Sequence, residues 1–219
     1  MNLVFDLDGT LVDSAPDLQA ATNHMLGQEG AAPVDLPTAT RFIGNGVPTL
    51  VARARRHRGL EDSEAQQAEA LARFQTYYSA HAADLTKLYP GVLDALGSLR
   101  AEGHAMALCT NKPEAPARAL LRALGLESFF QTVIGGDTTP AHKPDPRPVH
   151  AALAGLGEGP AAYIGDSEVD AQAALNAGLP FLLFTEGYRK SPASEIEAEA
   201  RFADFADLPA LVQGLAAQV

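Results

Sequence analysis

The chain has little of what would place it in an oxidising compartment or on a nucleic acid. One cysteine, Cys109, among 219 residues excludes an internal disulfide framework and fits a reducing cytosol. Lysine and arginine together number 16 against 27 aspartates and glutamates, which gives a net charge of -11. Because a phosphate backbone demands a positive surface, we expect no nucleic-acid partner.

Long apolar runs are also absent from the sequence. No stretch reaches the ~20 apolar residues that a membrane-spanning helix needs. The first apolar run has no basic region before it and soon becomes acidic, which is unlike a signal peptide. A hydrophobic content of 47% and a charged content of 20% are ordinary for a globular protein. These features predict a cytoplasmic protein with no membrane partner.

The spacing of apolar residues divides the chain into two parts. Residues 3–7 predict a short buried strand, whereas residues 15–85 show helical spacing and no convincing strand. Helices are expected at residues 16–28, 36–42, 47–58 and 62–83. Further along, strands are expected at residues 105–110, 132–135, 161–165 and 180–184, alternating with helices at 92–102, 113–124, 146–155, 169–177 and 208–217. Residues 186–200 are acidic and typical of a loop.

Strict alternation of strands and helices predicts a parallel sheet with helices on both faces. The expected fold class is therefore α/β, with a Rossmann-like parallel sheet core and an inserted small α-helical cap domain. The core should comprise residues 1–14 and 88–219, and the cap residues 15–87. Between residues 14 and 87 there are 7 basic and 8 acidic residues, against 9 and 19 elsewhere, so the insert holds a disproportionate share of the cations.

Polar residues gather where the expected strands end. Ligands in an open parallel sheet bind beyond the carboxyl ends of its strands, so clusters at those ends should meet at one place. Carboxylates without partners are costly to bury, and Asp6 and Asp8 should therefore meet a metal, a cation or a substrate. The other clusters are Thr110 with Asn111, the region of Lys143, and Gly165-Asp166-Ser167 with Asp170.

These residue types suit the transfer of a phosphoryl group. The carboxylates of Asp6, Asp8 and Asp166 are hard oxygen ligands of the kind that Mg²⁺ favours. One carboxylate can attack phosphorus and form an aspartyl-phosphate, while a second, two residues on, handles the proton. Lys143 and the donors at residues 110 and 111 would stabilise charge on the equatorial oxygens.

Several positions keep more than one interpretation. Asp170 could ligate the metal directly or orient Lys143 and a bound water. Ser167 could cap a helix or bind directly, and Thr110-Asn111 could be an ordinary helix cap, which is compatible with phosphate binding. Asp8-Gly9 is a common turn pair, and an isolated Lys143 would be a solvated lysine. The joint occurrence of these clusters favours the functional interpretation.

Four segments, in order, resemble the motifs of the haloacid dehalogenase-like hydrolase superfamily. They are Phe5-Asp6-Leu7-Asp8-Gly9-Thr10, Thr110-Asn111-Lys112, Lys143-Pro144 and Gly165-Asp166-Ser167-Glu168-Val169-Asp170. The resemblance implies Asp6 as nucleophile and Asp8 as general acid and base. It also implies Mg²⁺ held by Asp6, the Asp8 carbonyl and Asp166, and a phosphate bound by Thr110, Asn111 and Lys143. The helical insert looks like a small mobile cap, with hinges expected near residues 13–15 and 83–88.

Three longer stretches are most similar to bacterial phosphoglycolate phosphatases. They are Asp13-Ser14-Ala15-Pro16-Asp17-Leu18, Phe42-Ile43-Gly44-Asn45-Gly46 and Phe202-Ala203-Asp204-Phe205-Ala206-Asp207-Leu208. In that family the Gly-Asn-Gly loop faces the substrate, which implies a binding role for Gly44, Asn45 and Gly46. The segment Glu186-Gly187-Tyr188-Arg189 differs from the sequence that is more common at this place in the family.

The cap offers further candidates. Gly44-Asn45-Gly46 also reads as a plain turn between helices. Arg41 is a candidate for binding a substrate carboxylate. The basic run Arg53, Arg55, Arg56 and Arg58 is expected to be a solvated helix face, with electrostatic steering of anions as the alternative.

Together these features predict a Mg²⁺-dependent phosphatase for a small anionic phosphomonoester, most of all 2-phosphoglycolate, acting through an aspartyl-phosphate. The alternatives are action on a sugar phosphate or a nucleotide, a phosphomutase, and a non-catalytic binding module. The presence of Asp8 argues against a dehalogenase, because a departing halide needs no proton. We expect a monomer or a homodimer.

Overall fold

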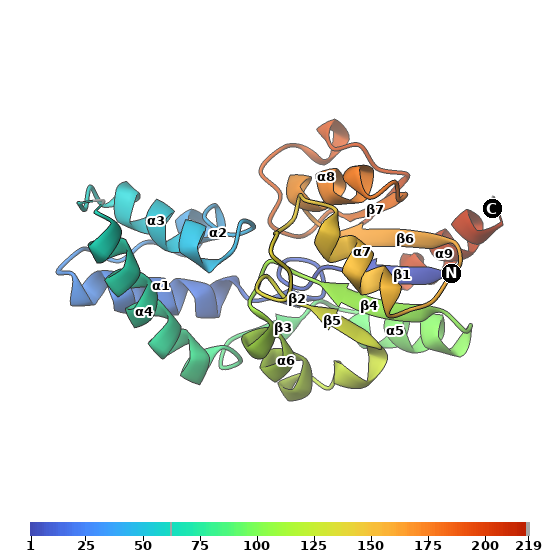
Figure 1. Cartoon of the computed structure of the whole chain (residues 1–219), viewed down its shortest axis with the longest axis horizontal. Coiled ribbons are helices and arrows are strands. Elements are labelled where there is room, and N and C mark those ends of the chain that lie inside the picture. The colour runs from blue at the N-terminus through green and yellow to red at the C-terminus, as the bar shows by residue number, and fades with distance from the viewer. Residues whose placement is uncertain (62, 218–219) are drawn as a thin grey trace. The chain divides into compact units, whose positions relative to one another are not determined.

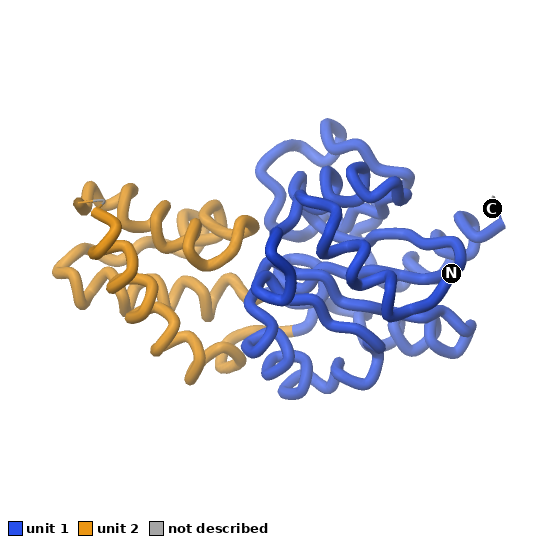
Figure 2. The backbone as a smooth tube through the Cα atoms, in the orientation of Figure 1, with its two compact units in different colours: residues 1–13, 88–219 blue, residues 14–87 orange. Residues whose placement is uncertain are grey.

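The structure is a computed structural model that describes residues 1–61 and 63–217. The chain forms two compact units, which are coloured separately in Figure 2. Unit 1 comprises residues Met1–Asp13 and Leu88–Val219, and unit 2 is the inserted segment Ser14–Lys87. Their roles as catalytic core and cap stay predictions.

Within the described residues, unit 1 is built on a six-stranded sheet in which every neighbouring pair is parallel. The strands are β1 (Asn2–Phe5), β4 (Ala105–Cys109), β5 (Thr132–Ile134), β6 (Ala161–Gly165), β7 (Phe181–Phe184) and β8 (Ala200–Phe202). Their order across the sheet is β5-β4-β1-β6-β7-β8. The α/β class and the parallel sheet expected from the alternation are thereby confirmed.

Helices cover both faces of this sheet (Figure 1). They are α5 (Val92–Ala101), α6 (Glu114–Ala123), α7 (Arg147–Ala154), α8 (Glu168–Asn176) and α9 (Leu208–Ala216), with 3-10 turns at Glu127–Phe129, Ala193–Glu195 and Phe205–Asp207. Alternate residues of a strand point to opposite faces. Leu3 and Phe5 accordingly pack in the cluster that includes α5, α6 and α9, whereas Val4 packs in the cluster with α7 and α8.

Unit 2 is helical in its described part. It consists of α1 (Ala15–Gln28), α2 (Leu36–Thr40), α3 (Val47–His57) and α4 (Glu64–His81). Local chemistry sets where these helices begin. Asp35 accepts a hydrogen bond from the Thr38 backbone at 2.9 Å and caps α2, while Ser63 caps α4 in the same way.

A few elements differ from the sequence-based expectation. Strand β8 lies in and beyond a region expected to be a loop, and it extends the sheet by pairing with β7. The short strands β2 (Val12–Asp13) and β3 (Lys87–Leu88) form a second, two-stranded sheet that the apolar pattern did not indicate. The fourth expected helix was to begin at Asp62, which lies outside the described residues. Among the described helices, none has the length and apolarity needed to cross a membrane.

Candidate active site

Two carboxylates stand at the point where the order of the sheet reverses. From β1 the chain builds β4 and β5 on one side, and it then crosses over to build β6, β7 and β8 on the other. Asp6 directly follows β1, and Asp166 directly follows β6, its neighbour in the sheet. The Asp6 amide donates to the Ile164 carbonyl at 2.9 Å, which continues the ladder to this edge. A reversal of strand order opens a crevice at the carboxyl ends, where ligands bind in such folds.

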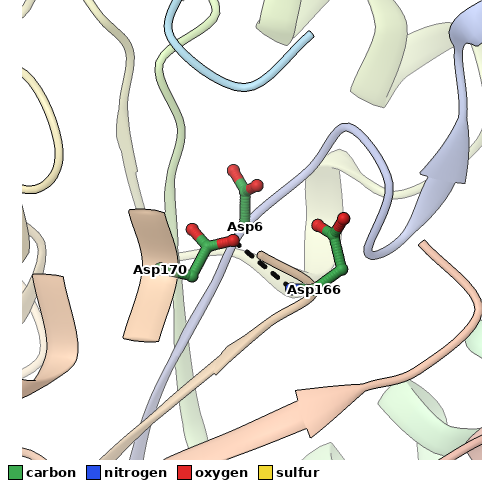
Figure 3. Close-up of side chains that lie close together, drawn as sticks. All are labelled: Asp6, Asp166 and Asp170. Carbon is green, nitrogen blue, oxygen red and sulfur yellow. Dashed lines mark hydrogen bonds between the residues drawn. The ribbon is translucent and has the colours of Figure 1, made fainter. Parts of the chain in front are cut away.

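Asp170, on the first turn of α8, completes a cluster with these two residues. One carboxylate oxygen from each of Asp6, Asp166 and Asp170 lies within 4.8 Å of the others (Figure 3). All three side chains are buried. Asp170 has no exposed surface, and Asp166 is 1% exposed. Like charges this close repel strongly away from water, so the arrangement calls for a cation.

Lys143 supplies one positive charge to this cluster. Its Nζ lies 2.8 Å from Asp6 Oδ1 and 2.6 Å from Asp170 Oδ1, and it donates to the Tyr163 hydroxyl at 2.9 Å. Asn111 holds the backbone of the lysine from both sides. Its Oδ1 accepts from the Lys143 amide at 2.9 Å, and its Nδ2 donates to the Lys143 carbonyl at 3.1 Å. The amide side chain of Asn111 therefore positions the lysine.

Burial and crowding shift the protonation equilibria of the cluster. Burial, and after it the charge of Asp170, raises the pKa of Asp6 to about 7 although Lys143 acts in the opposite direction. Burial, followed by Asp170 and Asp6, also raises the pKa of Asp166 well above its usual range. For Lys143, burial alone would lower the pKa, but Asp170 and Asp6 outweigh it and hold the pKa above its ordinary value. A single lysine thus leaves the negative charge of the carboxylates under-compensated.

The contacts of Asp170 bear on the two roles that the sequence left open for it. Its Oδ1 faces Lys143, while its Oδ2 accepts a hydrogen bond from the Ser167 hydroxyl at 2.7 Å. Ser167 and Asp170 form a reciprocal capping box at the start of α8. These contacts favour orientation of Lys143 by Asp170 and a capping role for Ser167.

Asp8 faces a different partner from Asp6. The ammonium of Lys112 lies 3.1 Å from Asp8 Oδ1 and 3.2 Å from Oδ2, and Lys112 is buried. The Lys112 amide donates to Thr110 Oγ1 at 3.2 Å, so the turn after β4 carries both the hydroxyl and this lysine. Asp6 and Asp8, two positions apart, therefore stand in distinct electrostatic surroundings.

Four residues of this region were not singled out from the sequence. Thr10 donates to Asp166 Oδ1 at 2.8 Å, and the Tyr188 amide donates to Asp166 Oδ2 at 2.6 Å. Tyr163 is a buried residue of strand β6, and a buried tyrosine hydroxyl needs a hydrogen-bond partner. A tyrosine in an otherwise apolar strand is therefore a signal that the sequence does contain. Lys112 stands beside Asn111 in a motif, whereas nothing local marks Tyr188, 22 residues from its carboxylate.

The candidates of unit 2 form a separate group around the start of α3. Gly44 and Gly46 have positive φ angles of 114° and 80°, which favour glycine. Arg53 donates to the Phe42 carbonyl at 3.0 Å and to Asn45 Oδ1 at 2.8 Å, so it fixes the loop. Arg41 is exposed and donates to Thr38 Oγ1 at 3.0 Å.

The expectation that residues 53–58 present a solvated basic face was wrong for Arg55. Its side chain is 2% exposed, pairs with Glu29, and donates to the Glu61 carbonyl at 2.5 Å. Periodicity gave no hint of this, because the partners lie on α1's end and on the loop before α4. Arg55 therefore connects elements of unit 2, and electrostatic steering by this basic run, the alternative interpretation, stays a prediction.

A family model described as haloacid dehalogenase-like hydrolase matches residues 3–184. A phosphoglycolate phosphatase of Cereibacter sphaeroides is 49% identical over 215 residues, covering 98% of this chain and 99% of the relative. One from Rhodobacter capsulatus is 46% identical over 217 residues, with 97% and 96% covered.

Solved structures agree with these relatives. A crystal structure described as a predicted phosphoglycolate phosphatase from Haemophilus somnus superposes with a TM-score of 0.90 at 32% identity, and 96% of each chain is covered. The chain belongs to the haloacid dehalogenase-like hydrolase family. Within that family it is a phosphoric monoester hydrolase that resembles phosphoglycolate phosphatase.

Proposed function

We propose that this enzyme hydrolyses 2-phosphoglycolate to glycolate and phosphate, with Mg²⁺ as cofactor and an aspartyl-phosphate on Asp6 as intermediate. The observation that carries the proposal is the crowding of Asp6, Asp166 and Asp170 around a single lysine at the reversal point of the sheet. Such a cluster is stable when a cation joins it, and a phosphate group can then approach without prohibitive repulsion.

The chemistry of the donors fits Mg²⁺. Carboxylate oxygens are its preferred protein ligands, and a site with few carboxylates leaves positions for water and for a substrate phosphate. Asp6, Asp166 and the Asp8 carbonyl would hold the ion. When bound, Mg²⁺ neutralises the carboxylates and the transferring phosphoryl group.

Asp6 acts as the nucleophile in the proposed reaction. One of its oxygens attacks phosphorus, an O–P bond forms, and the bond between phosphorus and the ester oxygen breaks. Lys143 lies 2.8 Å from the attacking carboxylate and balances its charge, and Thr110 adds a hydroxyl donor for the phosphate. The two groups stand on different loops that the parallel sheet brings to one edge.

Asp8 handles the proton in both halves of the reaction. It protonates the departing alkoxide of glycolate, and its carboxylate then takes a proton from the water that attacks the aspartyl-phosphate. Hydrolysis breaks the new O–P bond, releases phosphate and restores Asp6. Asp8 is paired with Lys112, whereas Asp6 faces Lys143, and these different partners suit two aspartates with different roles.

The choice of substrate is supported by the relatives that are named phosphoglycolate phosphatases. We further propose that Gly44, Asn45, Gly46 and Arg41 contact the distal end of the substrate. Arg41 is exposed and carries a fixed positive charge, which suits the carboxylate of 2-phosphoglycolate.

A substrate panel tests the proposal. Turnover of 2-phosphoglycolate, a sugar phosphate, a nucleoside monophosphate and an aryl phosphate is measured with Mg²⁺ and with a chelator. We expect the highest kcat/KM for 2-phosphoglycolate and loss of turnover with the chelator. A kcat/KM for 2-phosphoglycolate no higher than that for the generic aryl phosphate would overturn the substrate choice, and full turnover without divalent metal would overturn the cofactor.

The intermediate is tested separately. Acid quenching during turnover of a substrate labelled in its phosphate should leave an acid-stable, base-labile label on the peptide that contains Asp6. The Asp8→Asn variant should retain this label with an aryl phosphate, because a good leaving group needs no proton, and should release it slowly. Absence of label on residues 1–13 in both proteins would contradict a covalent mechanism.

A further inference from the structure

Tyr188 lies in the segment after β7 and makes contacts that the proposed reaction does not use. Its backbone amide donates to Asp166 Oδ2 at 2.6 Å, while Thr10 donates to the other oxygen at 2.8 Å. These two donors determine which way the Asp166 carboxylate faces. A carboxylate that binds a metal depends on partners of this kind to fix its orientation.

The packing around this amide leaves no room for adjustment. A Cβ at Gly9 would lie 2.5 Å from Asp166 Oδ2 and 2.8 Å from the Tyr188 ring. A Cβ at Gly187 would collide with both Asp166 and the Gly9 carbonyl. The backbone around Gly9 and that of residues 187–188 therefore close on Asp166 from two sides. The Tyr188 ring and the Asp166 carboxylate thus both lie against Gly9, and the Tyr188 amide joins them through its hydrogen bond.

The phenol of Tyr188 points to a different part of the chain. Its hydroxyl donates to Asp13 Oδ1 at 2.6 Å, and the phenols of Tyr188 and Tyr89 interact electrostatically. Asp13 is the last residue of unit 1 before the chain enters unit 2, and Tyr89 is the second residue after it returns. The Tyr89 amide also donates to the Leu11 carbonyl at 3.1 Å. The Tyr188 side chain is thus hydrogen-bonded to the first connection and interacts with Tyr89 of the second.

We propose that Tyr188 is a positioning residue that couples the Asp166 carboxylate to the two connections between the units. Metal binding at Asp166 and the conformation of residues 10–13 and 88–89 are then linked, and the link is reciprocal. Ordering of the connections improves the orientation of Asp166, and an ion held by Asp166 orders the connections. The inference rests on the proposed Mg²⁺ site. It adds Tyr188 as a positioning residue for Asp166 and couples metal binding to the order of the two connections.

The test uses the Tyr188→Phe variant, which removes the hydroxyl and keeps the ring and the amide. Mg²⁺ binding is measured by titration calorimetry, and amide hydrogen exchange of residues 10–14 and 86–90 is measured with and without Mg²⁺. In the wild-type protein we expect Mg²⁺ to slow exchange in both segments. In the variant we expect Mg²⁺ affinity to fall about tenfold and this protection to diminish, with the melting temperature of the metal-free protein little changed.

Three further variants complete the design. Asp13→Ala removes the acceptor of the same hydrogen bond, so its effect on Mg²⁺ affinity should not add to that of Tyr188→Phe in the double variant. Tyr77→Phe in α4 removes a phenol hydroxyl elsewhere and should leave affinity and protection unchanged. Asp166→Ala marks the loss of the site itself.

The outcomes separate this inference from the proposed function. Wild-type affinity and wild-type protection in both Tyr188→Phe and Asp13→Ala would overturn the coupling and leave the Mg²⁺ site standing. Absence of Mg²⁺ binding by the wild-type protein would overturn the metal site and the coupling together. If Tyr188→Phe does not fold, Asp13→Ala provides the same test from the other end of the hydrogen bond.

Discussion

Both units bury aspartates, and they treat these aspartates differently. Asp17 in unit 2 is 2% exposed and accepts hydrogen bonds from the amides of Leu85 and Thr86 and from the Thr86 hydroxyl, all between 2.6 and 3.1 Å. Asp6 in unit 1 is also buried, but it faces two other carboxylates and one lysine. A buried charge surrounded by donors stabilises a fold, whereas crowded charges store repulsion.

We infer from this difference that Asp17 has a structural role, whereas the proposed reaction uses the crowded carboxylates of unit 1. Crowded titratable groups with perturbed pKa values occur most often at functional sites, where the repulsion among them serves binding or catalysis. A bound cation and a phosphate use it in the proposed reaction. The following predictions test this distinction between the two units.

The largest expected effect is on catalysis. Asp6→Asn removes the nucleophile while keeping the size of the side chain, so turnover of a phosphomonoester should fall at least about 10⁴-fold. The far-ultraviolet circular dichroism spectrum should not change. Turnover within tenfold of wild type, measured with purified protein and Mg²⁺, would remove Asp6 from the nucleophile role and weaken the contrast with Asp17.

The second prediction concerns pH. Because the pKa of Asp6 is raised to about 7 in the folded chain from 3.8, the folded state holds a proton that the unfolded state has released. The free energy of unfolding of the metal-free protein should therefore fall as pH rises from about 4 to about 7, by a contribution from Asp6 on the order of 3 kcal/mol. Urea denaturation of wild type and Asp6→Asn across this range, in chelator, isolates that contribution.

Two comparisons check the sign of this effect. The variant should gain stability relative to wild type as pH rises, because it lacks the titrating carboxyl. Saturating Mg²⁺ should flatten the wild-type profile, since the ion favours the ionised carboxylates. A wild-type profile that rises with pH relative to the variant would mean that Asp6 is a satisfied charge like Asp17.

The third prediction concerns Asp17, the buried carboxylate that accepts hydrogen bonds from its neighbours. Asp17→Asn exchanges an acceptor for a donor that faces backbone amides, so it should lower the free energy of unfolding by about 2 kcal/mol. Equilibrium denaturation provides the measurement. A neutral or stabilising effect would show that the hydrogen-bonded carboxylate of Asp17 does not stabilise the fold.

The smallest effect is expected at an exposed pair. Arg73 and Glu69 face each other at 2.5 Å on α4 with 30% and 64% of their side chains exposed. Solvent screens such a pair, and Arg73→Ala should change the free energy of unfolding by no more than about 0.5 kcal/mol. A loss above about 1.5 kcal/mol in the same denaturation assay would show that exposed ion pairs of unit 2 contribute more to the free energy of unfolding than solvent screening permits.

Much of unit 1 could be predicted because the information is local. A parallel sheet places the carboxyl ends of its strands at one edge, so the alternation of strands and helices predicted that positions 6, 110 and 166 lie at the same edge. Asp170 illustrates the limit: its place four residues after Asp166 suggested two roles, and the contact with Lys143 Nζ at 2.6 Å favours one of them. Which atom faces which partner is a matter of packing.

What the sequence could not reveal depends on contacts between distant segments. Strand β8 has three residues, and its pairing with β7 gives it a structure that its own composition does not dictate. Arg55 was expected in solvent because its neighbours are basic, yet its partner Glu29 lies 26 residues away. Tyr188 reaches Asp13 across 175 residues. Periodicity and motif spacing carry no record of such pairs.

The contact of Arg53 with the Gly-Asn-Gly loop has a consequence for protein engineering. Positive φ angles restrict which residues can occupy positions 44 and 46 of the loop. Arg53 of α3 also stabilises the loop conformation through its hydrogen bonds to Phe42 and Asn45. Shorter or neutral side chains at position 53 would therefore loosen the loop without altering a residue of it. Under the substrate-binding role that we propose for this loop, a library at position 53 should change the range of accepted substrates without altering any residue of the Asp6 cluster.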